Sequence, residues 1–195
     1  MAREKVYEAS VKIVGVTPML MHKCGVIEKK ATSSTTDYSE EWIKTVYLDQ
    51  SQKYVAIPSM NLEAMFRDAS KGHKIGKSFM TKIVPTGLIV NEFEIPVYDE
   101  KGKQITIEKI QSNNWLFSCA AVVQKNRVNR IRACLPPGWN MEFSITIINP
   151  ILKPDVVEAL AERAGYEAGL CDWRPGAPKP GKFGQFELVS FDVIS

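Results

Sequence analysis

Residues 139–148 read WNMEFSITII, and this stretch decides the fold together with the segment that follows it. Every second residue from the methionine onward is apolar, which is the period of a strand with one buried face. Pro154 then begins a helix with one apolar face, which we expect to end at Gly165. A Gly/Pro-rich loop over 169–185 leads into a last expected strand over 186–194. The last third therefore predicts strand, helix, loop and strand.

The first third repeats this order. Residues 7–16 alternate as a strand, and the polar, Ser/Thr-rich segment 22–38 that follows has the character of a long loop. Residues 42–48 suit either a second short strand or a helical turn. A helix follows, with Ser59 as its expected N-cap. Its apolar stripe consists of Leu62, Met65, Phe66 and Ala69.

Two β-α-β units in one chain predict an α+β fold, the ferredoxin-like (RRM-like) arrangement with an antiparallel sheet. We expect a single domain over 1–195, with a long loop insertion at 22–53 after the first strand and a central insertion at 98–138 that contains a β-hairpin. In such a fold the helices cover one sheet face and leave the other free, as in RNA-recognition domains. The free sheet face is therefore a candidate binding site.

The middle of the chain offers shorter signals. Residues 88–95 alternate and predict a strand, and a turn at 99–102 leads to 104–109 as its hairpin partner. Residues 116–123 are apolar enough to form either a buried strand or a short helix. If the basic segment after them is extended from Asn129, Arg130 and Arg132 share one outward face, a spacing that suits a phosphate backbone. An ordinary exposed edge strand protected by its charges explains the same pattern.

The charges are strongly polarised although the net charge is only +3. Three tracts contain no acidic residue and together hold 12 of the 25 lysines and arginines. They lie between Asp68 and Glu92, between Glu108 and Glu142, and between Asp172 and Glu187. If the tracts converge in space, they form a positive face that attracts a polyanion; if they do not, they are ordinary solvated loops.

Composition also argues against several classes of protein. No apolar run approaches the roughly 18 residues of a membrane helix, and the N-terminus lacks a signal-peptide core, so we expect a cytoplasmic protein without membrane contact. The four cysteines are scattered and form no C-x-x-C pair, and the sequence holds only two histidines. We therefore expect reduced thiols, no metal and no cofactor. No P-loop, H-E-x-x-H or catalytic-triad order is present.

The Gly/Pro-rich loop places rings beside cations, at Trp173-Arg174 and Lys182-Phe183. Lysine and arginine neutralise phosphates, and aromatic rings stack on unpaired bases. The prolines would restrict the loop before binding. The alternative is that the aromatic residues plug the core beneath a surface loop. That alternative is favoured for Phe186 and is evenly matched with base stacking for Trp173.

Specific segments of the sequence resemble motifs of the RAMP superfamily, which includes CRISPR effector backbone subunits. Residues 48–69, LDQSQKYVAIPSMNLEAMFRDA, look like its acidic turn, I-P step, helix and arginine at the end of the second helical turn. Residues 127–145, RVNRIRACLPPGWNMEFSI, resemble its central basic segment and the strand that follows. The last helix, Gly-rich loop and strand are similar to a third signature. The family's I-P-G-S-S-L-K-G is I-P-S-M-N-L-E-A at 57–64, without either glycine, which indicates a divergent member, as in a phage or mobile element.

The resemblance implies a protein that binds single-stranded RNA or DNA, with RNA favoured, and forms a homo-oligomer along the strand. The loop at 22–38 would then reach a neighbouring copy. Combined with the charge tracts, it gives a predicted set of nucleic-acid-binding residues. These are Arg67, Lys71, Lys74, Lys77, Lys125, Arg127, Arg130, Arg132, Trp173, Arg174, Lys179, Lys182 and Phe183.

Two alternative functions stay open at the level of sequence. Some RAMP relatives cleave RNA with a loop aspartate or a histidine, to which Asp37 and His22 would correspond in an endoribonuclease. An Asx turn at Asp37 and a surface or capping role for His22 explain both residues without catalysis, so the protein is more readily a binding protein than an enzyme. The other alternative is a phage structural or assembly protein whose basic tracts meet acidic partner surfaces.

Overall fold

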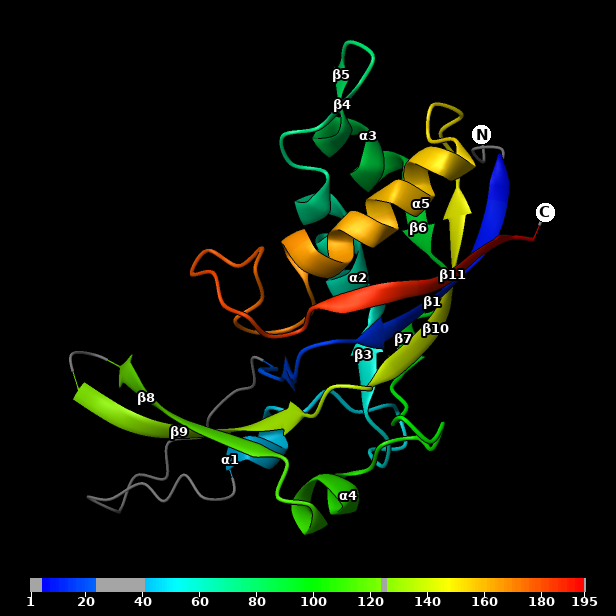
Figure 1. Ribbon diagram of the computed structural model, residues 1–195. Helices are drawn as coiled ribbons and strands as arrows, with labels where there is room; N and C mark the ends of the chain where they lie inside the picture. Colours follow the sequence, from blue (N-terminus) through cyan, green and yellow to red (C-terminus); the bar gives the residue numbers. More distant parts are fainter. Residues whose placement is uncertain (1–4, 24–40, 124–125, 195) are drawn as a thin grey trace.

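A four-stranded antiparallel sheet forms the centre of the computed structural model, which describes residues 5–23, 41–123 and 126–194 (Figure 1). The strand order is β11-β1-β10-β6. These strands are β1 (Tyr7–Gly15), β6 (Leu88–Val90), β10 (Asn140–Ile147) and β11 (Phe186–Val193). In chain order the fourth strand thus lies beside the first, and the third lies between the first and the second.

One face of this sheet is covered by two helices, α2 (Ser59–Ala69) and α5 (Pro154–Arg163) (Figure 1). Alternate residues of β1 and β10 are buried against them, and Val11 is paired with Phe143 in the register. The Phe143 ring meets Phe66 of α2 edge-on, with 6.4 Å between the ring centroids. The predicted apolar stripe of α2 is confirmed as buried. The protein is therefore an α+β fold with one helical layer on an antiparallel sheet.

The helix ends differ from the predictions in two places. Ser59 is the first residue of α2, and the preceding Pro58 occupies the cap position with extended backbone and no side-chain cap. Helix α5 does not end at Gly165 but continues as the π-helix η1 (Ala164–Ala168), because the Gly169 N–H bonds to the Ala164 carbonyl five residues earlier.

In the middle of the chain the observed elements differ most from those predicted. The stretch 88–95 is not one strand: β6 ends at Val90, and β7 (Glu94–Pro96) pairs with β3 (Ala56–Pro58). Residues 104–109 make two isolated bridges, from Gln104 to Tyr98 and from Thr106 to Tyr54, and then enter helix α4 (Ile107–Ser112). Thr106 caps this helix by accepting a bond from the Lys109 N–H, so helix formation outweighs the expected pairing.

The basic segment in the central insertion is extended. It forms β9 (Asn126–Leu135), which pairs with β8 (Leu116–Val123) and, at its end, with β2 (Met19–Leu20). The β8–β9 hairpin projects from the body of the molecule (Figure 1). Strand β8 is therefore not buried: Ser118 and Ala120 are exposed.

Four further elements complete the described part of the chain. The expected strand or turn near residue 42 is a helical turn, α1 (Glu41–Lys44). After α2 comes a small hairpin, β4 (Lys74–Ile75) and β5 (Ser78–Phe79), followed by helix α3 (Met80–Gly87). The sequence pattern predicts none of β4, β5 and α3. None of the described helices is long and apolar enough to cross a bilayer.

Candidate nucleic-acid interface

The free face of the sheet is acidic. Glu142 lies opposite Lys12 in the β1–β10 register, and Asp192 lies opposite Ser10 in the β1–β11 register. Glu92 lies beside them and accepts hydrogen bonds from the Ser144 amide and hydroxyl at 2.8–3.0 Å. A shallow cavity of about 400 Å³ opens on this face, and Lys12 is the single cation among the described residues that line it. Carboxylates repel phosphates, so the sheet face is a poor platform for a nucleic-acid backbone.

The Gly-rich loop, residues 169–185, is a structured segment. Its two sides are joined by hydrogen bonds from the Leu170 amide to the Gly184 carbonyl at 2.9 Å and from the Phe183 amide to the Trp173 carbonyl at 3.2 Å. Gly184 has φ +69°, and a Cβ there would lie 1.9 Å from the Leu170 carbonyl oxygen. Glycine at this position therefore permits close backbone packing. The loop is therefore held together by its own backbone contacts.

Asp68, at the end of α2, ties the Gly-rich loop to the helical layer. Its carboxylate is 6% exposed and accepts hydrogen bonds from Arg174 at 2.6 Å and Lys71 at 2.8 Å, while Arg67 lies 3.9 Å away. Burial alone would raise the pKa of Asp68, but the hydrogen bonds from Lys71 and Arg174 and their positive charges outweigh burial and lower it. The Arg174 guanidinium is thus already engaged by a carboxylate.

Asp172 ties the other side of the Gly-rich loop to β9. Its carboxylate forms an ion pair with Arg132, and its backbone bridges Leu20 of β2, with the Asp172 amide 2.9 Å from the Leu20 carbonyl. Arg132 is buried, at 9% residue exposure, and its Nε atom has no hydrogen-bond partner. The expectation that Arg132 points outward beside Arg130 is therefore wrong, because a carboxylate 40 residues away in sequence draws its side chain inward.

Three half-buried aromatic rings pack where the Gly-rich loop meets the β8–β9 hairpin. Phe117 of β8 contacts Trp173 and Phe183 with ring centroids 6.0 and 5.3 Å apart, and the Trp173–Phe183 distance is 6.2 Å. The Arg132 guanidinium lies 5.4 Å from the Trp173 ring centre. The rings of Trp173 and Phe183 thus join the hairpin to the loop. Phe186, by contrast, is buried in the core, as expected.

These contacts bring parts of the three acid-free tracts together. Arg174 of the third tract meets Lys71 of the first at Asp68, and Arg132 of the second meets the third at Asp172. The Gly-rich loop and the hairpin project on the same side of the molecule (Figure 1). We call the end of α2, the β4–β5 hairpin, the Gly-rich loop and the β8–β9 hairpin the basic edge. Its predicted cations with exposed side chains are Arg67, Lys71, Lys74, Lys77, Lys179 and Lys182.

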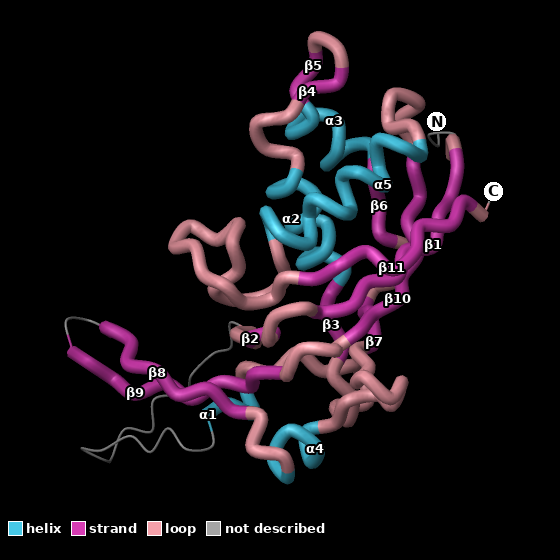
Figure 2. The backbone as a smooth tube through the Cα atoms, viewed as in Figure 1, coloured by secondary structure: helices cyan, strands magenta, loops and turns pink. Residues whose placement is uncertain are grey.

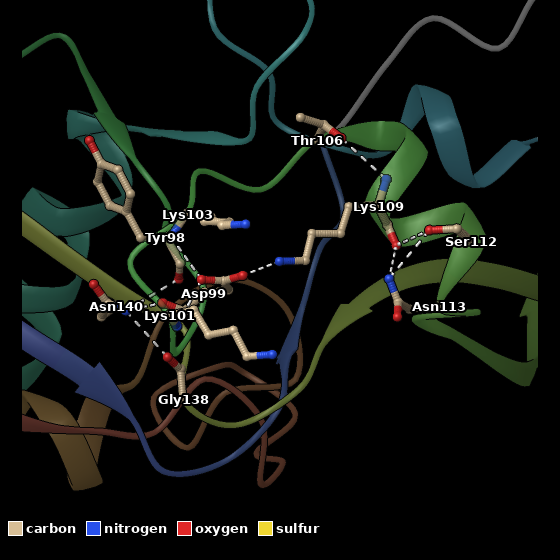
Figure 3. Close-up of polar contacts among 10 residues, drawn as sticks. All are labelled: Tyr98, Asp99, Lys101, Lys103, Thr106, Lys109, Ser112, Asn113, Gly138 and Asn140. Atoms are coloured by element: carbon tan, nitrogen blue, oxygen red, sulfur yellow. Dashed lines mark hydrogen bonds and ion pairs between the residues drawn. The ribbon is translucent and has the colours of Figure 1, made fainter.

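Lys109, which belongs to the second tract, is engaged elsewhere (Figure 3). Its ammonium binds the buried carboxylate of Asp99, which also accepts the Lys101 and Lys103 amides at 2.9 and 2.8 Å. Burial would raise the pKa of Asp99, but the bonds from Lys109 and the two amides outweigh it and lower that pKa. The Asn140 side chain donates to the Asp99 carbonyl at 2.7 Å. This cluster fastens α4 to the sheet and leaves Lys109 unsuited to binding phosphate.

The remaining predicted residues are placed only in part. Arg130 is half-buried in β9, opposite Cys119, and Arg127 lies on the same strand. Lys125 and Asp37 lie outside the described residues. His22 is exposed and its carbonyl accepts a bond from the Tyr47 hydroxyl at 3.5 Å.

The described cysteines lack the features of a reactive or metal-binding site. Cys119, Cys134 and Cys171 are free thiols, and Cys24 lies outside the described residues. Burial raises the pKa of Cys134 to about 11 and that of Cys171 to about 12, so both thiols stay protonated near neutral pH. Across the described ranges, no three His, Cys, Asp or Glu side chains gather as a metal site would require.

The fold has a counterpart in a solved assembly. A chain in the cryo-EM structure of the type III-B Cmr-β complex bound to cognate target RNA superimposes with a TM-score of 0.59. The two chains share this fold. Sequence identity is 14%, and the match covers 98% of this chain but 61% of the other. No protein-family model and no curated protein matches the sequence. The likeness therefore concerns the fold alone, and this chain spans less than two thirds of its structural counterpart.

Proposed function

We propose that the protein is a divergent, single-domain RAMP-type subunit with a ferredoxin-like sheet, and that it binds single-stranded RNA along the basic edge. The observation that carries the proposal is the convergence of the three acid-free tracts at Asp68 and Asp172. The β11-β1-β10-β6 order, in which two β-α-β units interleave, supports the ferredoxin-like assignment. The shared fold with a chain of an RNA-bound complex supports RNA as the ligand.

In this proposal the basic edge attracts the RNA phosphates, and the acidic sheet face repels them. Lys179 and Lys182 belong to the Gly-rich loop and Lys71 meets it at Asp68, whereas Glu142 and Asp192 lie on the sheet face. A phosphate chain is therefore drawn to the edge and repelled from the face. Arg132 and Arg174 act as positioning residues in this proposal, because their guanidiniums hold the loop through Asp172 and Asp68.

We further propose that several copies assemble along one RNA strand. The β8–β9 hairpin extends away from the body (Figure 1), and in this proposal it contacts a neighbouring copy. Light scattering with and without RNA tests this part separately: the mass should rise in steps when RNA is added. A mass that stays at one copy with saturating RNA would contradict assembly but leave RNA binding intact.

Fluorescence anisotropy of a labelled single-stranded RNA tests the binding itself. About four phosphate contacts, from Lys74, Lys77, Lys179 and Lys182, predict a log–log salt slope near −2.8, or about 50-fold weaker binding at 200 mM than at 50 mM salt. The double variant Lys179→Glu, Lys182→Glu should weaken binding at low salt at least tenfold.

The matched control reverses two exposed lysines away from the basic edge, Lys101→Glu with Lys103→Glu. It makes the same change in net charge, so it should retain most of the affinity if position decides binding. Equal losses in the two double variants, or no binding of the unmodified protein at low salt, would refute the proposal.

A further inference from the structure

The β4–β5 hairpin is a short projection with an unusual composition. It extends beyond α3 from the helical layer (Figure 2). Lys74 is paired with Phe79 and Ile75 with Ser78, which leaves the two-residue turn Gly76-Lys77. Gly76 has φ +59°, so glycine occupies the first turn position, as a type II′ turn requires. The turn thus presents Lys77 at the tip.

The two faces of this hairpin have different roles. Ile75 is partly buried and packs against the core, so it anchors the hairpin. Phe79 and Lys74 are cross-strand partners on the other face, which points away from that anchor. Phe79 is 46% exposed, and the Lys74 ammonium lies 4.4 Å from the centre of its ring. The chain therefore holds an aromatic ring partly in water, with a cation against it.

The charge around the exposed ring favours a polyanion. The hairpin lies inside the first acid-free tract, and both Lys77 and Lys82 are exposed. The chain has a useful contrast in Phe93, which is 86% exposed but stands between Glu92 and Glu94. A ring beside lysines suits a base with its flanking phosphates, whereas a ring between carboxylates repels the same ligand.

We propose that the β4–β5 hairpin binds one unpaired nucleobase by stacking on Phe79, while Lys74 and Lys77 hold the adjacent phosphates. This inference rests on the proposed RNA-binding function and adds a base-contacting residue to it. A duplex gains nothing from Phe79, because its bases are stacked and paired inside the helix. The hairpin accordingly gives the basic edge a preference for single strands.

Anisotropy with a single-stranded RNA of about 15 nucleotides and a duplex of the same length tests the role of the ring. Phe79→Leu should weaken single-strand binding about 5- to 10-fold, the low end for one stacked base, because Lys74 covers part of the ring. The salt slope and duplex binding should not change. Lys77→Gln should instead lower the salt slope by about 0.7 without a preference for single strands.

Two further variants keep the test decisive. Phe93→Leu removes the ring in the acidic setting and should bind like the unmodified protein, and Phe79→Tyr keeps a ring and should also bind normally. Phe79→Leu binding at full strength would overturn the inference while leaving RNA binding in place. Equal losses for single strand and duplex, or equal losses in Phe79→Leu and Phe79→Tyr, would also overturn it. Absence of binding by the unmodified protein would instead refute the proposed function.

Discussion

Replacing Asp68 by asparagine should loosen the Gly-rich loop from the helical layer. The amide keeps the shape of the side chain but lacks the charge that holds Arg174 at 2.6 Å and Lys71 at 2.8 Å. A hydrogen bond to a charged group contributes about 1.5–3 kcal/mol, and the amide oxygen can still accept one bond. Because Arg174 and Asp68 are mostly shielded from water, we expect Asp68→Asn to cost about 2 kcal/mol.

Thermal unfolding measures this loss. For a chain of this length, about 2 kcal/mol corresponds to a fall in Tm of about 4–8 °C. Glu158→Gln is a matched control on the exposed surface of α5 and should shift Tm by less than about 2 °C. A double-mutant cycle with Arg174→Met should give a coupling free energy of about 1–2 kcal/mol. A coupling near zero, or an Asp68→Asn protein as stable as Glu158→Gln, would refute the tethering role of Asp68.

The same variant has a signature in pH. The folded-state pKa of Asp68 is lowered, so its stabilising effect is present above the ordinary aspartate pKa and is lost as pH falls below about 4. Between about pH 5 and pH 3, the Tm of the unmodified protein should therefore fall further than the Tm of Asp68→Asn. Parallel Tm curves over this range would contradict the assignment.

Two other substitutions test the core and the loop. Burial raises the pKa of Tyr7 to about 12, and its hydroxyl donates to the Leu152 carbonyl at 3.0 Å. The stability that the neutral hydroxyl contributes is present below pH 10 and is lost as pH rises toward 12. Tyr7→Phe should therefore cost about 1 kcal/mol at neutral pH and flatten the alkaline fall in stability, as measured by urea unfolding. Gly184→Ala should cost more than about 3 kcal/mol, because its Cβ meets the Leu170 carbonyl. Gly72→Ala, which has a positive φ of +78° but open space around it, should cost only about 1–2 kcal/mol in the same assay; equal costs would contradict the packing argument.

The sequence predicts the elements in which apolar side chains recur at a regular spacing over many residues. Strand β10 and helix α2 each present a long regular pattern, so their existence and buried faces are correct. The β4–β5 hairpin was missed because strands of two residues have no measurable period. The pattern of residues 88–95 predicts one strand because the alternation continues across the break between β6 and β7, where the pairing partner changes from β10 to β3.

The candidate site was predictable as charge but not as geometry. The acid-free tracts are visible in the sequence, whereas the burial of Arg132 depends on Asp172, which lies 40 residues away. Phe117 is absent from the predicted site because its apolar run suggests a buried strand or a short helix, and only the packing of the Gly-rich loop reveals its contact with Trp173. The acidity of the sheet face likewise depends on register, which pairs Ser10 with Asp192. Long-range partners therefore decide which cations remain available.

Photocrosslinking of a 4-thiouridine-substituted single-stranded RNA, followed by mass spectrometry of the crosslinked peptides, tests the central claim most directly. The proposal that RNA runs along the basic edge predicts crosslinks in peptides covering residues 71–82, 126–135 and 172–186. Crosslinks concentrated in the sheet-face strands β1 and β10 would contradict it, as would a protein that forms no crosslink at low salt.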